Sequence, residues 1–188
     1  MKQQSLTAYV LRLALTLLLI TGVVAAALAG VNAITEPLIA DLNAKKLQKA
    51  INEVLPGGGT ALESFTDSTG LVSQVYKSDK GYAVEVRPAG FDGTITMMVG
   101  VGTDGKVLGI SIVKHTETAG LGAVAGANTS AGEAFRNQFI GISGSVSVSK
   151  DGGTADALTG ATITSRAICT GINAALACVG NLGSGGAL

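Results

Sequence analysis

The sequence has no tryptophan, and only four phenylalanines and three tyrosines among its 188 residues. It therefore lacks the row of aromatic rings on which the bases of single-stranded nucleic acids stack. Basic and acidic residues balance at 13 each and form no blocks of like charge. The basic patch that nucleic-acid binding requires is missing as well. We therefore expect no nucleic-acid partner.

Residues that bind metals or form disulfides are also scarce. Cys169 and Cys178 stand nine residues apart in a predicted helix, on nearly opposite faces, so they cannot bridge and suit small buried positions. His115 is the single histidine, and with Glu117 it falls short of the three or four ligands that zinc needs. The alternative that His115 acts as a general acid or base is also compatible with the sequence. We favour a polar strand end here, and expect no metal site and no catalytic residue.

One long stretch carries no charge at all. Leu13 to Val31 is 19 residues long and would span roughly 28 Å as a helix, close to the ~30 Å hydrocarbon core of a bilayer. We predict a transmembrane helix over 13–31, preceded by a cytoplasmic tail over 1–12. A cleaved secretory signal is the alternative, because Ala27-Leu28-Ala29 fits a cleavage site. Both interpretations export the C-terminal part.

The next segment, 32–59, is predicted to be a stalk helix and a linker. Pro37 suits the first turn of a helix, with Thr35 as its candidate cap. Apolar residues recur at roughly helical spacing from Glu36 to Leu55, and Pro56 to Gly59 ends the helix.

The sequence from 60 to 180 is predicted to be one extracytoplasmic domain. Its surest feature is a hairpin at Asp104-Gly105, a dipeptide that readily adopts tight turns. Before the turn, Ile95, Met97, Val99 and Val101 alternate on one face, and after it Leu108, Ile110 and Ile112 do. The expected strands are Leu71–Tyr76, Tyr82–Val86, Gly93–Gly102, Val107–Val113 and Gly144–Val148.

Two helices are expected in this domain, Ala131–Phe139 and Ser165–Val179. The second has a buried stripe comprising Ile168, Ile172, Ala175, Leu176 and Val179. Because the strands are mostly consecutive, the fold class is α+β, with an antiparallel sheet and packed helices. The glycine-rich end from Gly180 is expected to be loose, with a flexible tail over 181–188.

The segment Asp156–Ser165 places several hydroxyl groups and Gly160 just before the last helix. Gly160 and Ala161 allow a bulky group to approach the backbone, and a helix start favours phosphate. Thr164 or Ser165 can instead cap the helix. From the residues alone, a plain cap and a phosphate site both stay open, and the cap is favoured.

Two motifs together carry a resemblance. They are Asp156-x-x-Thr159-Gly160-Ala161-Thr162, and His115-x-Glu117-Thr118-x-Gly120-Leu121-Gly122. With them the chain resembles the G subunits of Rnf electron-transport complexes, which share FMN-binding domains with the C subunit of the sodium-pumping NADH:quinone oxidoreductase. The likeness covers the membrane segment and nearly all of the exported domain. One departure is Ala119, where the family usually has proline.

The resemblance implies a membrane-anchored electron-relay subunit rather than an independent enzyme. Its FMN would be joined covalently through the phosphate to Thr162 by an FAD-dependent flavin transferase that uses magnesium. His115, Glu117 and Thr118 would lie near the flavin, with Gly120 and Leu121 beside them. Asp156 and Thr159 would shape the loop that the transferase reads, and Gly160 and Ala161 belong to it.

The resemblance also implies partners and a location. The other membrane subunits of the complex would surround the chain. The complex as a whole would couple electron flow between ferredoxin and NAD to the movement of sodium ions or protons across the inner membrane. The C-terminal domain would lie on the periplasmic side. Two alternatives remain open: a secreted soluble flavin carrier released after Ala29, and a non-redox assembly module with Thr162 unmodified.

Overall fold

A computed structural model describes residues 6–184, and the chain divides into two compact units at Lys45/Lys46. Both include part of one long helix, α1 (Leu6–Val54). Its large apolar side chains between Tyr9 and Leu42 are exposed. Ala8–Val54 is long and apolar enough to cross a membrane, and its most apolar window has a mean hydropathy of 2.4 with nothing buried. This exposed apolar surface is the kind that lipid covers.

The expected start of a second helix at Thr35 is wrong. The helix runs on through Pro37, and the Thr35 hydroxyl donates a hydrogen bond back to the Val31 carbonyl at 3.0 Å instead of capping. A proline inside a helix removes its own amide donor, here the one that would reach Ala33, and its ring crowds the Ala33 carbonyl. The helix nevertheless continues on both sides of Pro37.

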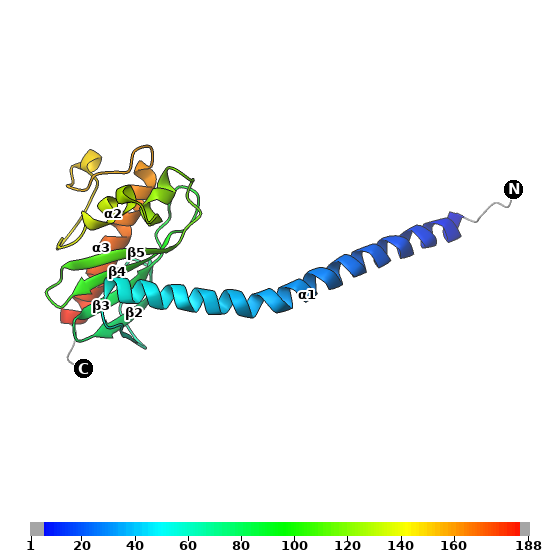
Figure 1. Cartoon of the computed structure of the whole chain (residues 1–188), viewed down its shortest axis with the longest axis horizontal. Helices are drawn as coiled ribbons and strands as arrows, with labels where there is room; N and C mark the ends of the chain where they lie inside the picture. The colour runs from blue at the N-terminus through cyan, green and yellow to red at the C-terminus, as the bar shows by residue number, and fades with distance from the viewer. Residues whose placement is uncertain (1–5, 185–188) are drawn as a thin grey trace. The chain divides into compact units, whose positions relative to one another are not determined.

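The second unit contains a five-stranded antiparallel sheet whose strands follow chain order (Figure 1). Each strand pairs with the next, so the fold class is α+β as predicted. The Asp104-Gly105 turn is confirmed: Gly105 has a φ of 75°, and the Gly102 amide donates to the Lys106 carbonyl at 2.8 Å. The strands are β1 (Thr60–Ala61), β2 (Val72–Ser78), β3 (Gly81–Val86), β4 (Thr96–Gly102) and β5 (Val107–Lys114).

Two sequence expectations about strands are wrong. Leu108 is exposed rather than core-facing, because the register between β4 and β5 shifts between Gly100 and Val101, and the shift puts Val107 in the core instead. No strand covers Gly144–Val148 within the part that the structure describes. Val148 makes only an isolated bridge to Ala155.

Four helical segments follow the sheet in the chain. The predicted helix near Ala131 is confirmed as α2 (Ser130–Asn137), capped by the Thr129 hydroxyl. The last helix, α3 (Thr162–Ser184), starts earlier than expected and includes the residues from Gly180 to Ser184, which were expected to be loose. The rest of the predicted tail lies outside the described residues. The short 3-10 helices are η1 (Gly122–Gly126) and η2 (Ser149–Asp151).

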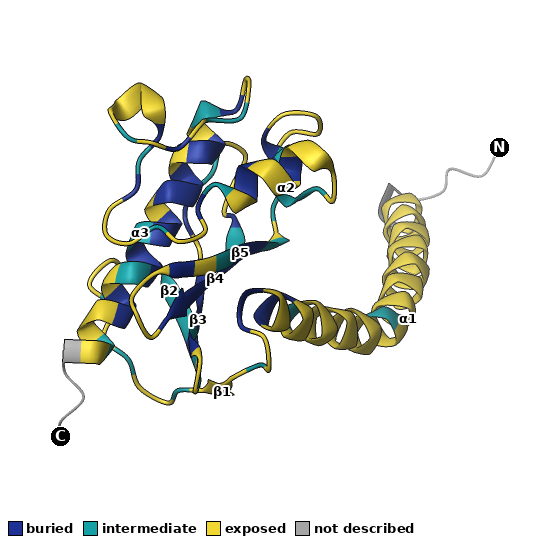
Figure 2. Cartoon of the chain, turned by 60° about the vertical axis from the view of Figure 1, so that its left-hand side comes forward, coloured by how far each residue is buried: buried dark blue, intermediate teal, exposed yellow. Residues whose placement is uncertain are grey.

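The sheet is covered on both faces, and Figure 2 shows the buried residues gathered on the strands and α3. One core joins the α3 stripe, including Ile168 and Ile172, to Met97 and Val99 of β4. A second, smaller core lies on the opposite face, where the end of α1 packs against Ala83 and Met98. Alternate residues of β4 therefore point to opposite faces of the sheet, with Met97 and Val99 on one face and Met98 on the other. The second core comprises Ala50, Ile51, Val54, Leu55, Ala83 and Met98.

The two cysteines of α3 are free and buried. Burial raises the pKa of the Cys169 thiol to about 11 and raises that of Cys178 as well. Both thiols are therefore un-ionised at neutral pH, which suits the predicted role as small buried residues.

The contact between α1 and the sheet gives a testable prediction at Gly100. A Cβ atom there would collide with the Val54 carbonyl group, whose carbon would be 2.9 Å away. At the paired Gly109 on β5 the nearest such atom, the Val54 Cα, is 3.9 Å away, an ordinary contact. We expect Gly100→Ala to lower the free energy of unfolding by about 1–3 kcal/mol. Gly109→Ala, the matched control, should change it by only about 0.5 kcal/mol. Denaturant titration of both variants compares the losses, and equal losses would contradict the packing.

Candidate functional site

The segment before α3 ends in a tight turn that places the half-buried Thr162 at the helix start. Gly160 has a φ of 73°, a conformation that suits glycine, and a Cβ there would lie 2.9 Å from Leu121 Cδ2. The Ser165 amide donates to the Ala161 carbonyl at 3.0 Å, the first bond of the helix. The amides of residues 162–164 precede it and have no acceptor within the helix. The helix start thus offers N–H groups beside the Thr162 hydroxyl.

Neither Thr164 nor Ser165 caps α3, so this expectation is wrong. The helix begins at Thr162, which places both residues inside its first turn. The Ser165 hydroxyl accepts a bond from the Leu158 amide at 3.0 Å and donates to the Ala161 carbonyl at 3.0 Å, which fixes the preceding loop on the helix. The Thr164 hydroxyl donates to a carboxylate on another segment, that of Glu117.

Glu117 connects three segments that are far apart in the sequence. Its side chain is buried, and one carboxylate oxygen accepts the amides of Phe91 and Asp92 at 2.9 and 3.1 Å. The other oxygen accepts the Thr164 hydroxyl. These donors satisfy a buried carboxylate that has no cation partner among the described residues. Gly122 makes room for this arrangement, because a Cβ there would lie 2.5 Å from Thr164 Oγ1.

A cavity of about 300 Å³ opens over this junction. Three of the apolar side chains in its wall are exposed: Phe91, Leu121 and Ile163. Its size is at the lower end of the usual range for small-molecule sites, about 300–1,000 Å³. The lining residues are Phe91, Glu117, Thr118, Leu121, Gly122, Lys150, Gly160, Ala161, Thr162, Ile163 and Thr164.

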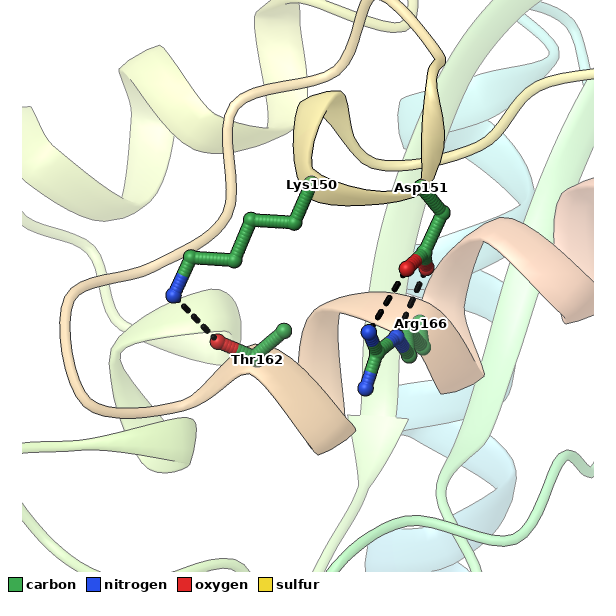
Figure 3. A network of polar contacts seen from close by, with 4 residues as sticks. All are labelled: Lys150, Asp151, Thr162 and Arg166. Atoms are coloured by element: carbon green, nitrogen blue, oxygen red, sulfur yellow. Dashed lines mark hydrogen bonds and ion pairs between the residues drawn. The ribbon is translucent and has the colours of Figure 1, made fainter.

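Two neighbouring residues of η2, Lys150 and Asp151, contact the start of α3 (Figure 3). The Lys150 ammonium lies 3.4 Å from the Thr162 hydroxyl oxygen and can donate to it. The neighbouring Asp151 accepts two bonds from the Arg166 guanidinium, at 2.7 and 2.6 Å. These bonds lower the pKa of the Asp151 carboxyl and raise that of Arg166. The bidentate pair ties η2 to the first turns of α3.

Six of the ten residues that the sequence singled out line this cavity: Glu117, Thr118, Leu121, Gly160, Ala161 and Thr162. The other four lie nearby in the chain but outside the lining. Gly120 occupies a turn with a φ of 76°, and Thr159 is exposed. Asp156 is held through its backbone by Gln138, at 2.7 and 3.1 Å.

His115 lies at the end of β5 and does not line the cavity either. Its ring packs against η1, where a Cβ on Gly126 would be 3.3 Å from Nε2. Its Nδ1 atom is buried and has no hydrogen-bond partner among the described residues. Within residues 6–184, no group of three or more histidine, cysteine, aspartate or glutamate side chains could hold a metal ion.

Phe91 and Lys150 were missed by sequence reasoning. Phe91 lies in the connection between β3 and β4, and Lys150 lies in η2, 12 residues before Thr162. Neither belongs to a motif, and both reach the cavity only through tertiary packing. A larger cavity of about 680 Å³ lies along the C-terminal half of α3, and none of the predicted site residues lines it. The position of the motifs therefore selects the smaller cavity.

Comparison with known proteins finds relatives over most of the chain. Residues 90–177 match the model of the FMN-binding domain family, a range that contains both motifs. The G subunit of the Na(+)-translocating ferredoxin:NAD(+) oxidoreductase complex of Acetobacterium woodii is 31% identical, over 92% of this chain and 93% of the relative. The G subunit of the ion-translocating oxidoreductase complex of Methanosarcina acetivorans is 31% identical, over 86% of this chain and 89% of the relative. The corresponding subunit of Shewanella baltica is 32% identical, over 82% of this chain and 80% of the relative. The chain therefore belongs to the family of G subunits of ion-translocating oxidoreductase complexes, and it contains an FMN-binding domain.

Proposed function

We propose that this chain is the electron-relay subunit of a membrane-bound, ion-translocating ferredoxin:NAD oxidoreductase and carries FMN in a phosphoester bond to Thr162. The observation that carries the proposal is the position of the Thr162 hydroxyl. It lies in the wall of a cavity inside the matched FMN-binding domain, at the positive end of α3 and 3.4 Å from the Lys150 ammonium. Each of these features favours a phosphate ester at this oxygen.

The residues present fit such a group. The amides at the start of α3 and the Lys150 ammonium would face the phosphate. The apolar side chains of Phe91, Leu121 and Ile163, which are exposed, would contact the flavin ring. Gly122 and Gly160 let the segments of the wall pack closely, because a Cβ there would meet Thr164 Oγ1 or Leu121 Cδ2. When bound, FMN supplies one- and two-electron transfer, and the protein supplies position and electrostatics.

Attachment requires a second protein, because a free threonine hydroxyl is a poor nucleophile. The co-substrate is FAD, and the partner is a magnesium-using flavin transferase. A bond forms between Thr162 Oγ1 and the phosphorus of the FMN half. The bond between that phosphorus and the oxygen bridging to AMP breaks, and AMP leaves with the oxygen. The hydroxyl proton passes to a base of the transferase.

We also propose a location, which α1 supports in part. Its exposed apolar surface would anchor the chain in the inner membrane, with other subunits of the complex around it and the FMN-binding domain on the periplasmic side. Retention of Met1 to Ala29 in the intact mass of membrane-extracted protein would distinguish this anchored subunit from a secreted flavin carrier.

In-gel fluorescence tests the flavin bond directly. The full chain is expressed with and without an FAD-dependent flavin transferase, extracted from membranes and run under denaturing conditions. We expect a yellow, fluorescent band at the mass of the chain only when the transferase is present. A colourless band in its presence would support the unmodified assembly module instead.

A further inference from the structure

Lys150 is the free cation at the cavity. Among the described residues it makes no ion pair, and its one hydrogen bond reaches Thr162. The carboxylate next to it in the chain, Asp151, is already engaged by Arg166 in a bidentate pair. The Lys150 charge is therefore left to the Thr162 hydroxyl and to whatever group is attached there.

The Asp151–Arg166 pair also fixes where this charge lies. Arg166 is one helical turn beyond Thr162 on α3, and Asp151 follows Lys150 directly (Figure 3). The pair thus joins the backbone of η2 to the helix that bears Thr162. A lysine on its own has a flexible stem of four carbons. Anchoring its backbone at the next residue keeps the hydroxyl within reach of the ammonium.

The remaining charged side chain in the cavity does not compete for Lys150. The Glu117 carboxylate accepts three hydrogen bonds from other segments, so its oxygens are occupied. A phosphodiester at Thr162 would bring one negative charge to a position between the Lys150 ammonium and the start of α3. Among the described residues Lys150 therefore has no anionic partner, and the attached phosphate would supply one.

We propose that Lys150 is a positioning residue for flavin attachment, holding the phosphorus of the incoming FAD against the Thr162 hydroxyl and remaining as the cation partner of the ester. This inference rests on the proposed function. Lys150 neither gives nor takes the proton in the step. It offsets the negative charge that builds up on the phosphoryl oxygens as the bond to Thr162 Oγ1 forms and the bond to AMP breaks.

The test measures the initial rate of flavin attachment rather than electron transfer. The purified full chain in detergent is incubated with FAD, Mg²⁺ and the transferase, and the modified fraction is followed by intact mass. We expect Lys150→Gln to lower the initial rate about 10- to 100-fold, the loss typical of one hydrogen bond to a charged group. Lys150→Arg keeps the positive charge and should restore most of the rate.

The matched control is Lys106→Gln, an exposed lysine in the turn between β4 and β5 that is absent from the cavity lining. It should be modified at the wild-type rate. Because Lys150 is exposed, Lys150→Gln should unfold at the wild-type denaturant concentration. An unchanged rate in Lys150→Gln, or an equal loss in Lys150→Arg, would overturn the role of the charge. A wild-type chain that takes up no flavin would instead refute the proposed function.

Discussion

Replacing Thr162 by alanine should abolish covalent flavin while leaving the fold intact. The substitution removes the one oxygen that we propose to be esterified. Thr162 is the first residue of α3, alanine is the best helix former, and the only hydrogen bond of the Thr162 side chain among the described residues is the long one to Lys150. We therefore expect no in-gel fluorescence from the variant after expression with the transferase, and an unfolding midpoint close to that of the wild-type chain.

Thr170→Ala is the control for this experiment. Thr170 lies on the same helix, is exposed, and its hydroxyl donates only to the Arg166 carbonyl one turn earlier, at 3.0 Å. The change in composition is the same, but the cavity is untouched. This variant should carry as much flavin as the wild-type chain. Fluorescence in Thr162→Ala equal to that of Thr170→Ala would contradict attachment at Thr162.

Glu117→Ala should cause the largest loss of stability at the site. The substitution removes the acceptor of three donors: the partly buried amides of Phe91 and Asp92, and the buried Thr164 hydroxyl. A buried donor left unsatisfied costs about 1–3 kcal/mol and a partly buried one costs less, so the free energy of unfolding should fall by about 2–3 kcal/mol. Denaturant titration measures the loss. Flavin attachment should fall with it, because Glu117 joins the walls of the cavity.

Glu117→Gln separates the hydrogen bonds from the charge. The glutamine carbonyl can still accept both amides, and its NH₂ group can donate to the Thr164 oxygen once that hydroxyl has rotated. We therefore expect a much smaller loss of stability than in the alanine variant. Equal losses in the two variants would mean that the negative charge of Glu117, rather than its bonds, stabilises the junction.

The sheet was largely predictable because its signals are local. Alternation before and after the Asp104-Gly105 turn identified the hairpin, and Ile95, Met97, Val99 and Val101 all lie in the core. The prediction that Leu108 faces the core was wrong because of a register shift between β4 and β5. Such a shift depends on how the two strands pair, so the sequence of either strand alone does not indicate it. Pro37 misled for a related reason: it suits a helix start, but the surrounding helix continues through it.

The site was predictable only in part. Gly160, Ala161 and Thr162 are consecutive, so the sequence alone brought them together. Glu117 came from a second motif, and its contact with Thr164 spans 47 residues of the chain. Lys150 is different, because its role depends on a 3-10 turn that the Asp151–Arg166 pair attaches to α3. No spacing rule in the sequence indicates such a contact.

Peptide mass spectrometry of the flavin-loaded chain tests the central claim most directly. Trypsin cleavage after Lys150 and Arg166 releases residues 151–166, which contain five hydroxyl side chains: Thr154, Thr159, Thr162, Thr164 and Ser165. We predict that this peptide gains the mass of one FMN less one water, and that fragmentation assigns the gain to Thr162. An unmodified peptide, or a flavin on any of the other four residues, would contradict the account.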